Sequence, residues 1–251
     1  MSRTYTTKAI ILQGKNHGEA DRIVTAFTKE RGKVDFYARG VRKIQGKNRA
    51  LVQPFTYSEL ELVERKGLDL LTQGLLIESF SRIQGDFQRI ITATYLAEYL
   101  IQVLPSRDPV PELCHEFLRA LNHMDKRPAP PDLVGLVFLI RSFVWLGYQP
   151  ALDACCACHR PVGTVDGGRY IPDEGFVCLA CQTGRGIPMD RALLDYYASL
   201  EAADLRGLSA RLEDPLLMER AACFVENLLF FILEREHRSA SFLQKIRRMQ
   251  L

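Results

Sequence analysis

Four cysteines in the second half of the chain have the spacing of a metal site. Cys155 and Cys158 are separated by two residues, as are Cys178 and Cys181, and a longer segment separates the two pairs. A two-residue spacer lets both thiolates of a pair reach one ion, and two pairs complete a tetrahedral four-thiolate zinc site. Because such a site has no open coordination position, the predicted Zn²⁺, one per chain, is structural and does not activate water.

Two other interpretations of these cysteines stay open. The pairs could be redox pairs, although a redox pair normally opens a helix in a thioredoxin-like unit. A metal site could also use Cys156 or His159, which lie within or beside the first pair. Arg160, Arg169 and Arg185 either offset the negative charge of four thiolates on zinc or are simply solvated.

A basic segment in the first fifth of the chain predicts contacts with phosphates. Residues 39–49 hold five cations and no acid, and two glycines make the segment a flexible loop. The alternative is a solvated loop, but the clustering favours a nucleic-acid-binding loop, together with a lysine in the preceding turn. The predicted DNA-binding residues are Lys33, Arg39, Arg42, Lys43, Lys47 and Arg49.

The distribution of charge supports a polyanionic partner or another negative surface. Residues 1–50 contain 12 Lys and Arg against four acids, a balance of +8, whereas the whole chain is only +3. A basic head on a slightly acidic body is typical of binding to a negative surface. The five histidines are scattered, and neither a nucleophile elbow, a P-loop nor a dinucleotide fingerprint occurs. The sequence therefore predicts a binding protein and not an enzyme.

The sequence also predicts where the protein works. The first residues lack the apolar stretch and cleavage site of a secretory signal. The longest apolar stretch, Leu133–Leu146, is interrupted by Arg141 and is too short to span a bilayer. A cytoplasmic protein without membrane contact is expected, in which cysteines stay reduced.

Residues 1–80 read as a small barrel. Five short β-branched or alternating runs separated by glycine turns predict strands, and five strands in this length fit an OB-like barrel, whose open face commonly binds single strands. A small barrel without a ligand is the alternative. The expected strands are residues 4–13, 22–28, 33–38, 55–63 and 68–77.

The rest of the chain reads as helices interrupted by the cysteine segment. Apolar residues at every fourth position from Phe87 to Val103 predict one helix. Pro131 suits the first position of another that Gly147 ends, and Asp190 can cap a third. We therefore expect an α+β multidomain protein. It consists of an OB-fold domain (1–80), a helical domain (81–149 and 187–251) and an inserted zinc finger (150–186). The helices are expected at about 83–105, 111–124, 131–146, 190–200 and 216–236.

This order of basic barrel, helical body and four-cysteine insertion resembles the bacterial RecO family of recombination mediators in DNA repair. The likeness spans nearly the full length and is most specific in the basic loop and the finger. It is carried by residues 18–28, 32–33, 38–43, 49–55, 146–148, 152–155 with the two cysteine pairs, and, more weakly, 238–243.

The resemblance implies an OB-fold, a helical domain and a zinc finger. It also implies binding of single- and double-stranded DNA, annealing of complementary strands, and help in recombinase loading. The implied partners are RecR and the acidic C-terminal tail of single-stranded-DNA-binding protein, for which Arg141 is the candidate contact. Two alternative functions remain: a nuclease or other nucleic-acid enzyme with a zinc ribbon, and a zinc-ribbon module that binds only proteins.

Overall fold

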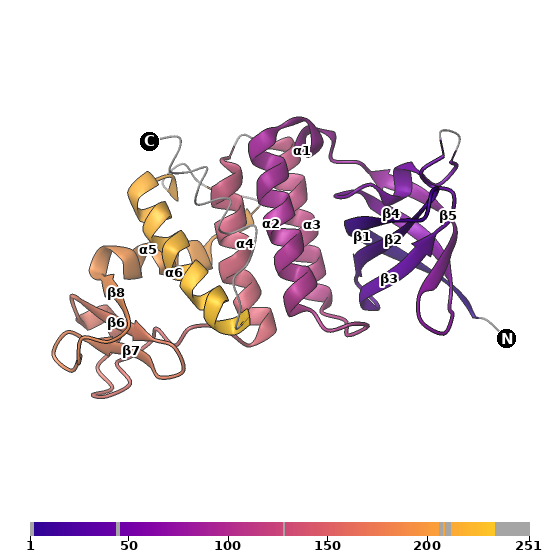
Figure 1. Cartoon of the computed structure of the whole chain (residues 1–251). Helices are drawn as coiled ribbons and strands as arrows, with labels where there is room; N and C mark the ends of the chain where they lie inside the picture. The colour runs from indigo at the N-terminus through magenta and orange to yellow at the C-terminus, as the bar shows by residue number, and fades with distance from the viewer. Residues whose placement is uncertain (1–2, 44–45, 128, 206–207, 209–211, 234–251) are drawn as a thin grey trace. The chain divides into compact units, whose positions relative to one another are not determined.

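The structure is a computed structural model and describes residues 3–43, 46–127, 129–205, 208 and 212–233 (Figure 1). The chain divides into two compact units, Met1–Pro131 and Asp132–Leu251. The division into residues 1–80, a split helical domain and an insertion at 150–186 stays a prediction, because compactness groups the first helices with the strands.

Five strands close into a barrel in the first unit. They are β1 (Thr4–His17), β2 (Asp21–Thr28), β3 (Gly32–Ala38), β4 (Tyr57–Val63) and β5 (Asp69–Glu78). The order around the barrel is β1-β2-β3-β5-β4, and β4 pairs with β1 to close it. The ladders are antiparallel except where β3 meets β5 at Phe36 and Tyr37. This topology confirms the predicted OB-like barrel.

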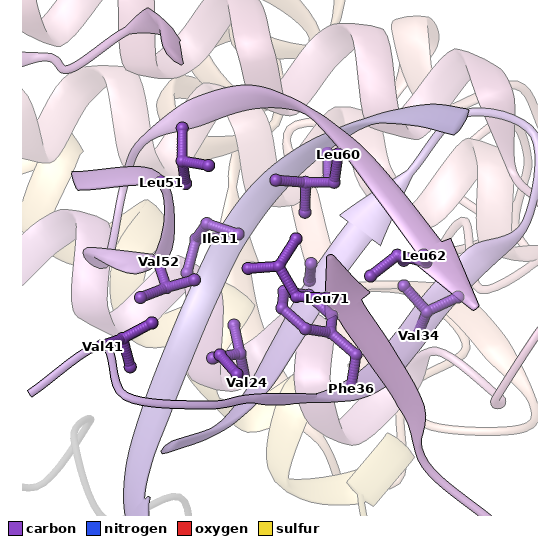
Figure 2. Packing of buried hydrophobic residues seen from close by; sticks show 13 residues of the cluster. Ile11, Val24, Val34, Phe36, Val41, Leu51, Val52, Leu60, Leu62 and Leu71 are labelled. Carbon is purple, nitrogen blue, oxygen red and sulfur yellow. The ribbon is translucent and has the colours of Figure 1, made fainter. Parts of the chain in front are cut away.

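Alternate strand residues fill the barrel, as the period of two predicts. In β3, Val34, Phe36 and Ala38 are buried while the residues between them are partly exposed. A short 3₁₀ helix, η1 (Ala50–Val52), contributes Leu51 and Val52 to the same core. Figure 2 shows the converging side chains, which include Ile11, Val24, Val34, Phe36, Val41, Leu51, Val52, Leu60, Leu62 and Leu71.

The strand predicted to start at Phe55 begins two residues later. Phe55 is buried, but its φ of 63° places its backbone in the left-handed region, ahead of β4. Within β4 the buried positions are Ser58, Leu60 and Leu62, and Tyr57 is half-buried.

Three helices follow the barrel in the same unit: α1 (Ser81–Gly85), α2 (Phe87–Val103) and α3 (Pro111–Lys126). Asp86 caps α2, since its side chain accepts a hydrogen bond from the backbone N–H of Arg89 at 2.9 Å. The predicted apolar stripe is confirmed at Tyr95 and Tyr99, which are buried. It is wrong at Phe87, which is 66% exposed because it occupies the first position of α2.

The linker between α2 and α3 packs against the turn between β2 and β3. The backbone N–H of Arg107 donates to the carbonyl of Lys33 at 2.9 Å, and the Arg107 guanidinium donates to the buried Asp69 carboxylate at 2.8 Å. Gly32 has a φ of +62°, and a Cβ there would lie 2.0 Å from the carbonyl oxygen of Asp108. The close approach therefore requires glycine at this turn.

The second unit contains α4 (Pro131–Leu146), α5 (Arg191–Ala202) and α6 (Pro215–Leu233). Gly147, whose φ is positive, follows the end of α4 as predicted. Asp190 caps α5 as predicted, since it accepts from the backbone N–H of Leu193 at 2.9 Å. The expected end of the last helix at 236 lies outside the described residues, as does the family-like stretch 238–243. In the described part of the chain, no helix combines the length and apolarity needed to cross a bilayer.

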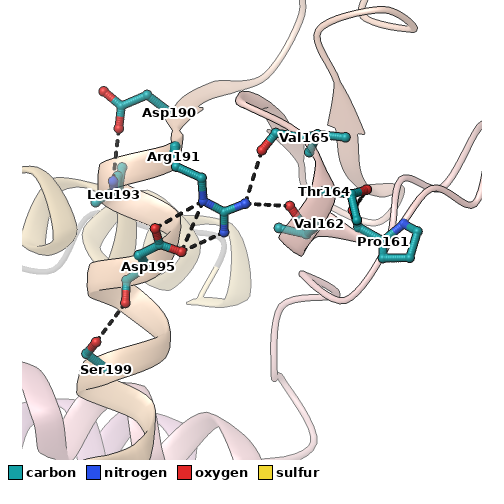
Figure 3. Close-up of polar contacts among 9 residues, drawn as sticks. All are labelled: Pro161, Val162, Thr164, Val165, Asp190, Arg191, Leu193, Asp195 and Ser199. Atoms are coloured by element: carbon teal, nitrogen blue, oxygen red, sulfur yellow. Dashed lines mark hydrogen bonds and ion pairs between the residues drawn. The ribbon is translucent and has the colours of Figure 1, made fainter.

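Between α4 and α5 lies a small antiparallel sheet of β6 (Gly167–Ile171), β7 (Gly175–Cys178) and β8 (Ile187–Asp190), in the order β7-β6-β8. Arg191, the first residue of α5, fastens the preceding segment to this helix (Figure 3). Its guanidinium donates to the carbonyls of Val162 at 2.7 Å and Val165 at 3.1 Å, and it pairs with Asp195 at 2.6 Å.

Candidate nucleic-acid interface and metal centre

The basic loop, defined as residues 39–49, leaves β3 and leads into η1. Its five cations are exposed, and residues 44 and 45 are not described. None of these five side chains enters the ion pairs found in the described part of the chain. In the described part of the chain, no carboxylate therefore forms an ion pair with these cations. The five residues are Arg39, Arg42, Lys43, Lys47 and Arg49.

The turn between β1 and β2 holds the first half of the basic loop. The backbone N–H of Arg42 donates to the carbonyl of Ala20 at 2.9 Å, and its guanidinium donates to the carbonyl of Gly18 at 2.9 Å. The Asp21 carboxylate accepts hydrogen bonds from the Gly40 N–H at 2.7 Å and from the Tyr37 hydroxyl. These contacts fix the backbone from which Arg39 and Arg42 project.

Asp21 stays ionised in this positive region. The hydrogen bond from Tyr37, followed by the one from the Gly40 N–H, holds the pKa of Asp21 below its ordinary value. The same hydrogen bond to Asp21 raises the pKa of Tyr37. The carboxylate thus acts as a hydrogen-bond acceptor that organises the loop.

The second half of the basic loop is fastened to the barrel wall. The Asn48 amide donates to the carbonyl of Thr72 on β5 at 3.2 Å, and the Gln53 amide donates to the carbonyl of Arg49 at 2.8 Å. Arg22 on β2 reaches Gln53 at 3.5 Å. Exposed Lys15 lies on the neighbouring strand, opposite Ile23. The sequence reasoning did not single out Arg22, because only the fold brings it to Gln53.

Lys33 has a different environment from the other predicted DNA-binding residues. It is half-buried, and its ammonium donates to the carbonyl of Ile101 at 2.6 Å. Burial lowers its pKa, opposed by the charge of Asp35. Lys33 therefore has an internal partner at the junction between barrel and helices.

The four predicted metal ligands come together in the second unit. One ligand atom from each of Cys155, Cys158, Cys178 and Cys181 lies within 4.8 Å of the others, and this is the single such group of three or more His, Cys, Asp or Glu in the described residues. The Sγ atoms of Cys158 and Cys178 are 3.8 Å apart. Cys156 and His159 fall outside the group, although the residues beside them belong to it.

The local geometry of the four cysteines fits a cation. The backbone N–H of Cys178 donates to the Cys155 sulfur at 3.4 Å. Burial opposes ionisation of Cys155, but backbone hydrogen bonds from Cys178, Cys158 and Ala157 outweigh it and lower its pKa to about 6. Hydrogen bonds to Cys158 and Cys178 raise the pKa of Cys181 to about 12. Four clustered sulfurs cannot all carry negative charge alone, and a bound cation would remove this conflict.

Two of the three arginines near the cysteines have side-chain partners elsewhere in the segment. Arg185 pairs with Glu174 at 3.3 Å, and Arg169 donates to the carbonyl of Arg185 at 3.0 Å. Arg141, the candidate contact for the acidic protein tail, lies outside this segment, on α4, and donates to the carbonyl of Ala203 at 3.0 Å. These contacts give Arg169 and Arg185 a role in holding the loop between β7 and β8.

Comparison with known proteins matches both halves of the chain to one protein family. The family model described as "Recombination protein O N terminal" matches residues 1–80, and "Recombination protein O C terminal" matches residues 84–219. A DNA repair protein RecO from Heliobacterium modesticaldum is 32% identical over 98% of this chain and 91% of its own length. A protein with the same name from Syntrophomonas wolfei is 34% identical over 70% of this chain and 69% of its own length. Another, from Desulfitobacterium hafniense, is 35% identical over 73% of this chain and 67% of its own length.

Proposed function

The chain belongs to the recombination protein O (RecO) family, and on that premise we propose that it binds single- and double-stranded DNA as a mediator of DNA repair and recombination. The observation that supports this proposal is the basic loop, with five exposed cations on an OB-like barrel. Contacts with phosphates do not depend on base sequence and suit both forms of DNA. Lys33 belongs to the proposed set, although a phosphate would have to compete with the carbonyl of Ile101 for its ammonium.

The proposed mechanism of annealing is charge neutralisation. Two complementary strands repel each other through their phosphates, and a shared cationic surface lowers this repulsion. The anchored ends of the basic loop support this role, because they hold its backbone in place before DNA arrives. No covalent bond is made or broken, so the protein is proposed to act without catalysis.

The four cysteines are proposed to hold one structural zinc ion. When bound, zinc would cross-link the two cysteine pairs and so stabilise the sheet of β6, β7 and β8 against the loops that carry the ligands. A closed four-thiolate site supports a structural role, since it leaves no position for a water nucleophile.

The proposed partners follow from the family. We infer that RecR and the acidic tail of single-stranded-DNA-binding protein bind this chain in the cytoplasm, at the nucleoid when DNA is bound. The tail carboxylates would need a cation, and Arg141 is the candidate, although its guanidinium already donates to Ala203. Together these partners would assist loading of the recombinase.

The test is a fluorescence anisotropy titration of single-stranded and duplex oligonucleotides at several salt concentrations. The variant Arg39→Ala/Arg42→Ala/Lys43→Ala removes three proposed phosphate contacts. The plot of log affinity against log salt has a negative slope, and the magnitude of this slope should decrease by about 2 for single strands and about 3 for duplex. The control Arg82→Ala/Arg119→Ala/Arg127→Ala removes the same charge from exposed positions on and beside α1 and α3 of the same unit.

The control should keep the wild-type slope. Equal slopes for the loop variant and the wild type would show that the DNA-binding surface lies elsewhere. Strand annealing measured with and without single-stranded-DNA-binding protein tests the mediator role. Cleavage of labelled DNA in the presence of Mg²⁺ would contradict the proposed non-enzymatic action and favour the nuclease alternative.

A further inference from the structure

Two aromatic rings lie beside the basic loop, on the outer side of the barrel. His17 is the last residue of β1 and is exposed, and Tyr37 is the penultimate residue of β3 and is half-buried. Their ring centroids are 5.4 Å apart and their planes meet at 80°, so the rings pack edge to face. This contact joins two strands that are neighbours of β2 but not of each other.

The ring pair is held in a fixed position. The Tyr37 hydroxyl donates to Asp21, and the other oxygen of the same carboxylate accepts from the Gly40 N–H at 2.7 Å. Asp21 is also the direct cross-strand partner of His17 in the β1–β2 ladder. The Asp21 carboxylate therefore holds both the Tyr37 ring and the start of the basic loop next to β2, the strand that pairs with β1 at His17.

Cations surround the ring pair. The Arg39 guanidinium lies 5.9 Å from the centre of the Tyr37 ring, within the range of a cation–π contact. Arg42 reaches back to Gly18, the residue after His17, and exposed Lys15 precedes the pair on β1. A DNA backbone that contacts these cations would pass next to the exposed ring of His17.

We propose that His17 and Tyr37 form a base-stacking platform, on which an unpaired base of the bound strand packs against the exposed His17 ring while Tyr37 supports that ring from behind. The inference rests on the proposed DNA binding by the basic loop and adds the chemical group that is recognised beside the phosphates. Any base has a flat aromatic face, so the contact does not require a particular sequence.

The platform would give single-stranded DNA a higher affinity than duplex DNA, although the basic loop attracts both. In a duplex each base face is covered by its neighbours, so only phosphates are available to the loop. In a single strand a base can turn outward and stack. A stacked base strengthens binding by about 5-fold to 150-fold, which is about 1–3 kcal/mol converted at 25 °C.

The experiment compares two probes with the same number of phosphates: an oligothymidylate and an oligomer of the same length with abasic sites. Wild-type protein should bind the oligothymidylate at least about 5-fold more tightly. His17→Ala should reduce this ratio to below about 2, and His17→Phe, which keeps a ring without the ionisable nitrogens, should restore it. Neither change removes a cation of the basic loop, so both variants should keep the wild-type salt slope.

A second pair of variants separates the ring of Tyr37 from its hydrogen bond. Tyr37→Phe removes the contact with Asp21 but keeps the ring, and should retain most of the preference for bases. Tyr37→Leu keeps apolar bulk without the ring and should lose it. A thermal melt of each variant identifies any that fails to fold, and His17→Ala, at an exposed position, decides the question alone in that case.

Equal binding of both probes by the wild-type protein would overturn the platform. A preference that survives His17→Ala would overturn it as well. Neither result would affect the proposed phosphate contacts, which the salt slope measures. Absence of binding to both probes at low salt would instead contradict the proposed DNA binding.

Discussion

Gly32 offers a stability test of the junction between the barrel and its helices. Its φ is +62°, and a Cβ would lie 2.0 Å from the carbonyl oxygen, 2.5 Å from the carbonyl carbon and 2.9 Å from the nitrogen of Asp108. Real contacts are never this short, so Gly32→Ala must displace the linker between α2 and α3. Gly18 is a matched control, because its φ is +58° and nothing lies within 4 Å of its Cβ position.

The two substitutions share a backbone cost and differ in the displaced contacts. Alanine in the left-handed region costs about 1–2 kcal/mol at either position. At Gly32 the displaced linker would also strain or break the Arg107 hydrogen bond to Lys33, the Lys33 ammonium contact with Ile101 and the pairing of Arg107 with buried Asp69. At about 1 kcal/mol for each contact, added to the backbone cost, Gly32→Ala should lower the free energy of unfolding by roughly 4–5 kcal/mol.

Urea denaturation followed by far-UV circular dichroism measures both changes. The Gly32 variant should lose at least about 2 kcal/mol more than the Gly18 variant, which is a large part of an ordinary folding stability. Equal losses would mean that the linker is free to move away, and that the barrel and α1–α3 do not form a tightly packed unit.

Three further predictions concern individual side chains. Cys178→Ser should lower zinc from about one ion per chain to well below one in metal analysis, whereas Cys156→Ser should leave it unchanged. The pKa of Asp21 is depressed in the folded protein, so the stability from its hydrogen bonds is fully present above its unfolded pKa of about 4. This stability is lost only as the pH falls through the lower folded pKa. The amide resonance of Gly40 should follow this change in an NMR titration, and a titration midpoint above about 4 would contradict the prediction. Arg191→Lys cannot bridge the carbonyls of residues 162 and 165 while pairing with Asp195, and should lower the midpoint of thermal unfolding. An unchanged midpoint would refute the role of this bridge.

The elements with a clear sequence period were predictable from the sequence. Strand alternation in residues 33–38 and the Gly and Pro signals around α4 each follow from local chemistry, and the structure confirms them. The four cysteines were predictable as a group because a two-residue spacer places both thiolates of a pair within reach of one ion. The exclusion of Cys156 from this group was not predictable, because it depends on how the chain turns between Cys155 and Cys158.

The contacts around the basic loop were beyond a reading of the sequence. Asp21 carries a negative charge beside cations, and only the fold shows that it accepts hydrogen bonds from Tyr37 and Gly40. Lys33 looks like a surface cation in the sequence, but the end of α2 provides the carbonyl of Ile101. In both cases the partner is distant in sequence, so neither periodicity nor charge counting contains the information.

The four-cysteine cluster and the basic loop belong to different compact units, which makes their proposed roles separable. The anchors of the loop at Gly18, Asp21 and Thr72 lie within the first unit, and the four cysteines lie in the second. Removing zinc with a chelator, or with Cys178→Ser, should therefore leave the salt slope for single-stranded DNA unchanged within about 0.5, less than one phosphate contact.

The same treatment should loosen the second unit. Amide hydrogen exchange should increase in β6 and β7, because the cysteine pairs would no longer be cross-linked, while protection in β1–β5 should persist. A fall of the salt slope in parallel with zinc loss would contradict this separation. It would mean that the zinc segment supplies phosphate contacts or holds the basic loop in place, and the exposed Arg160 would then be the first residue to test.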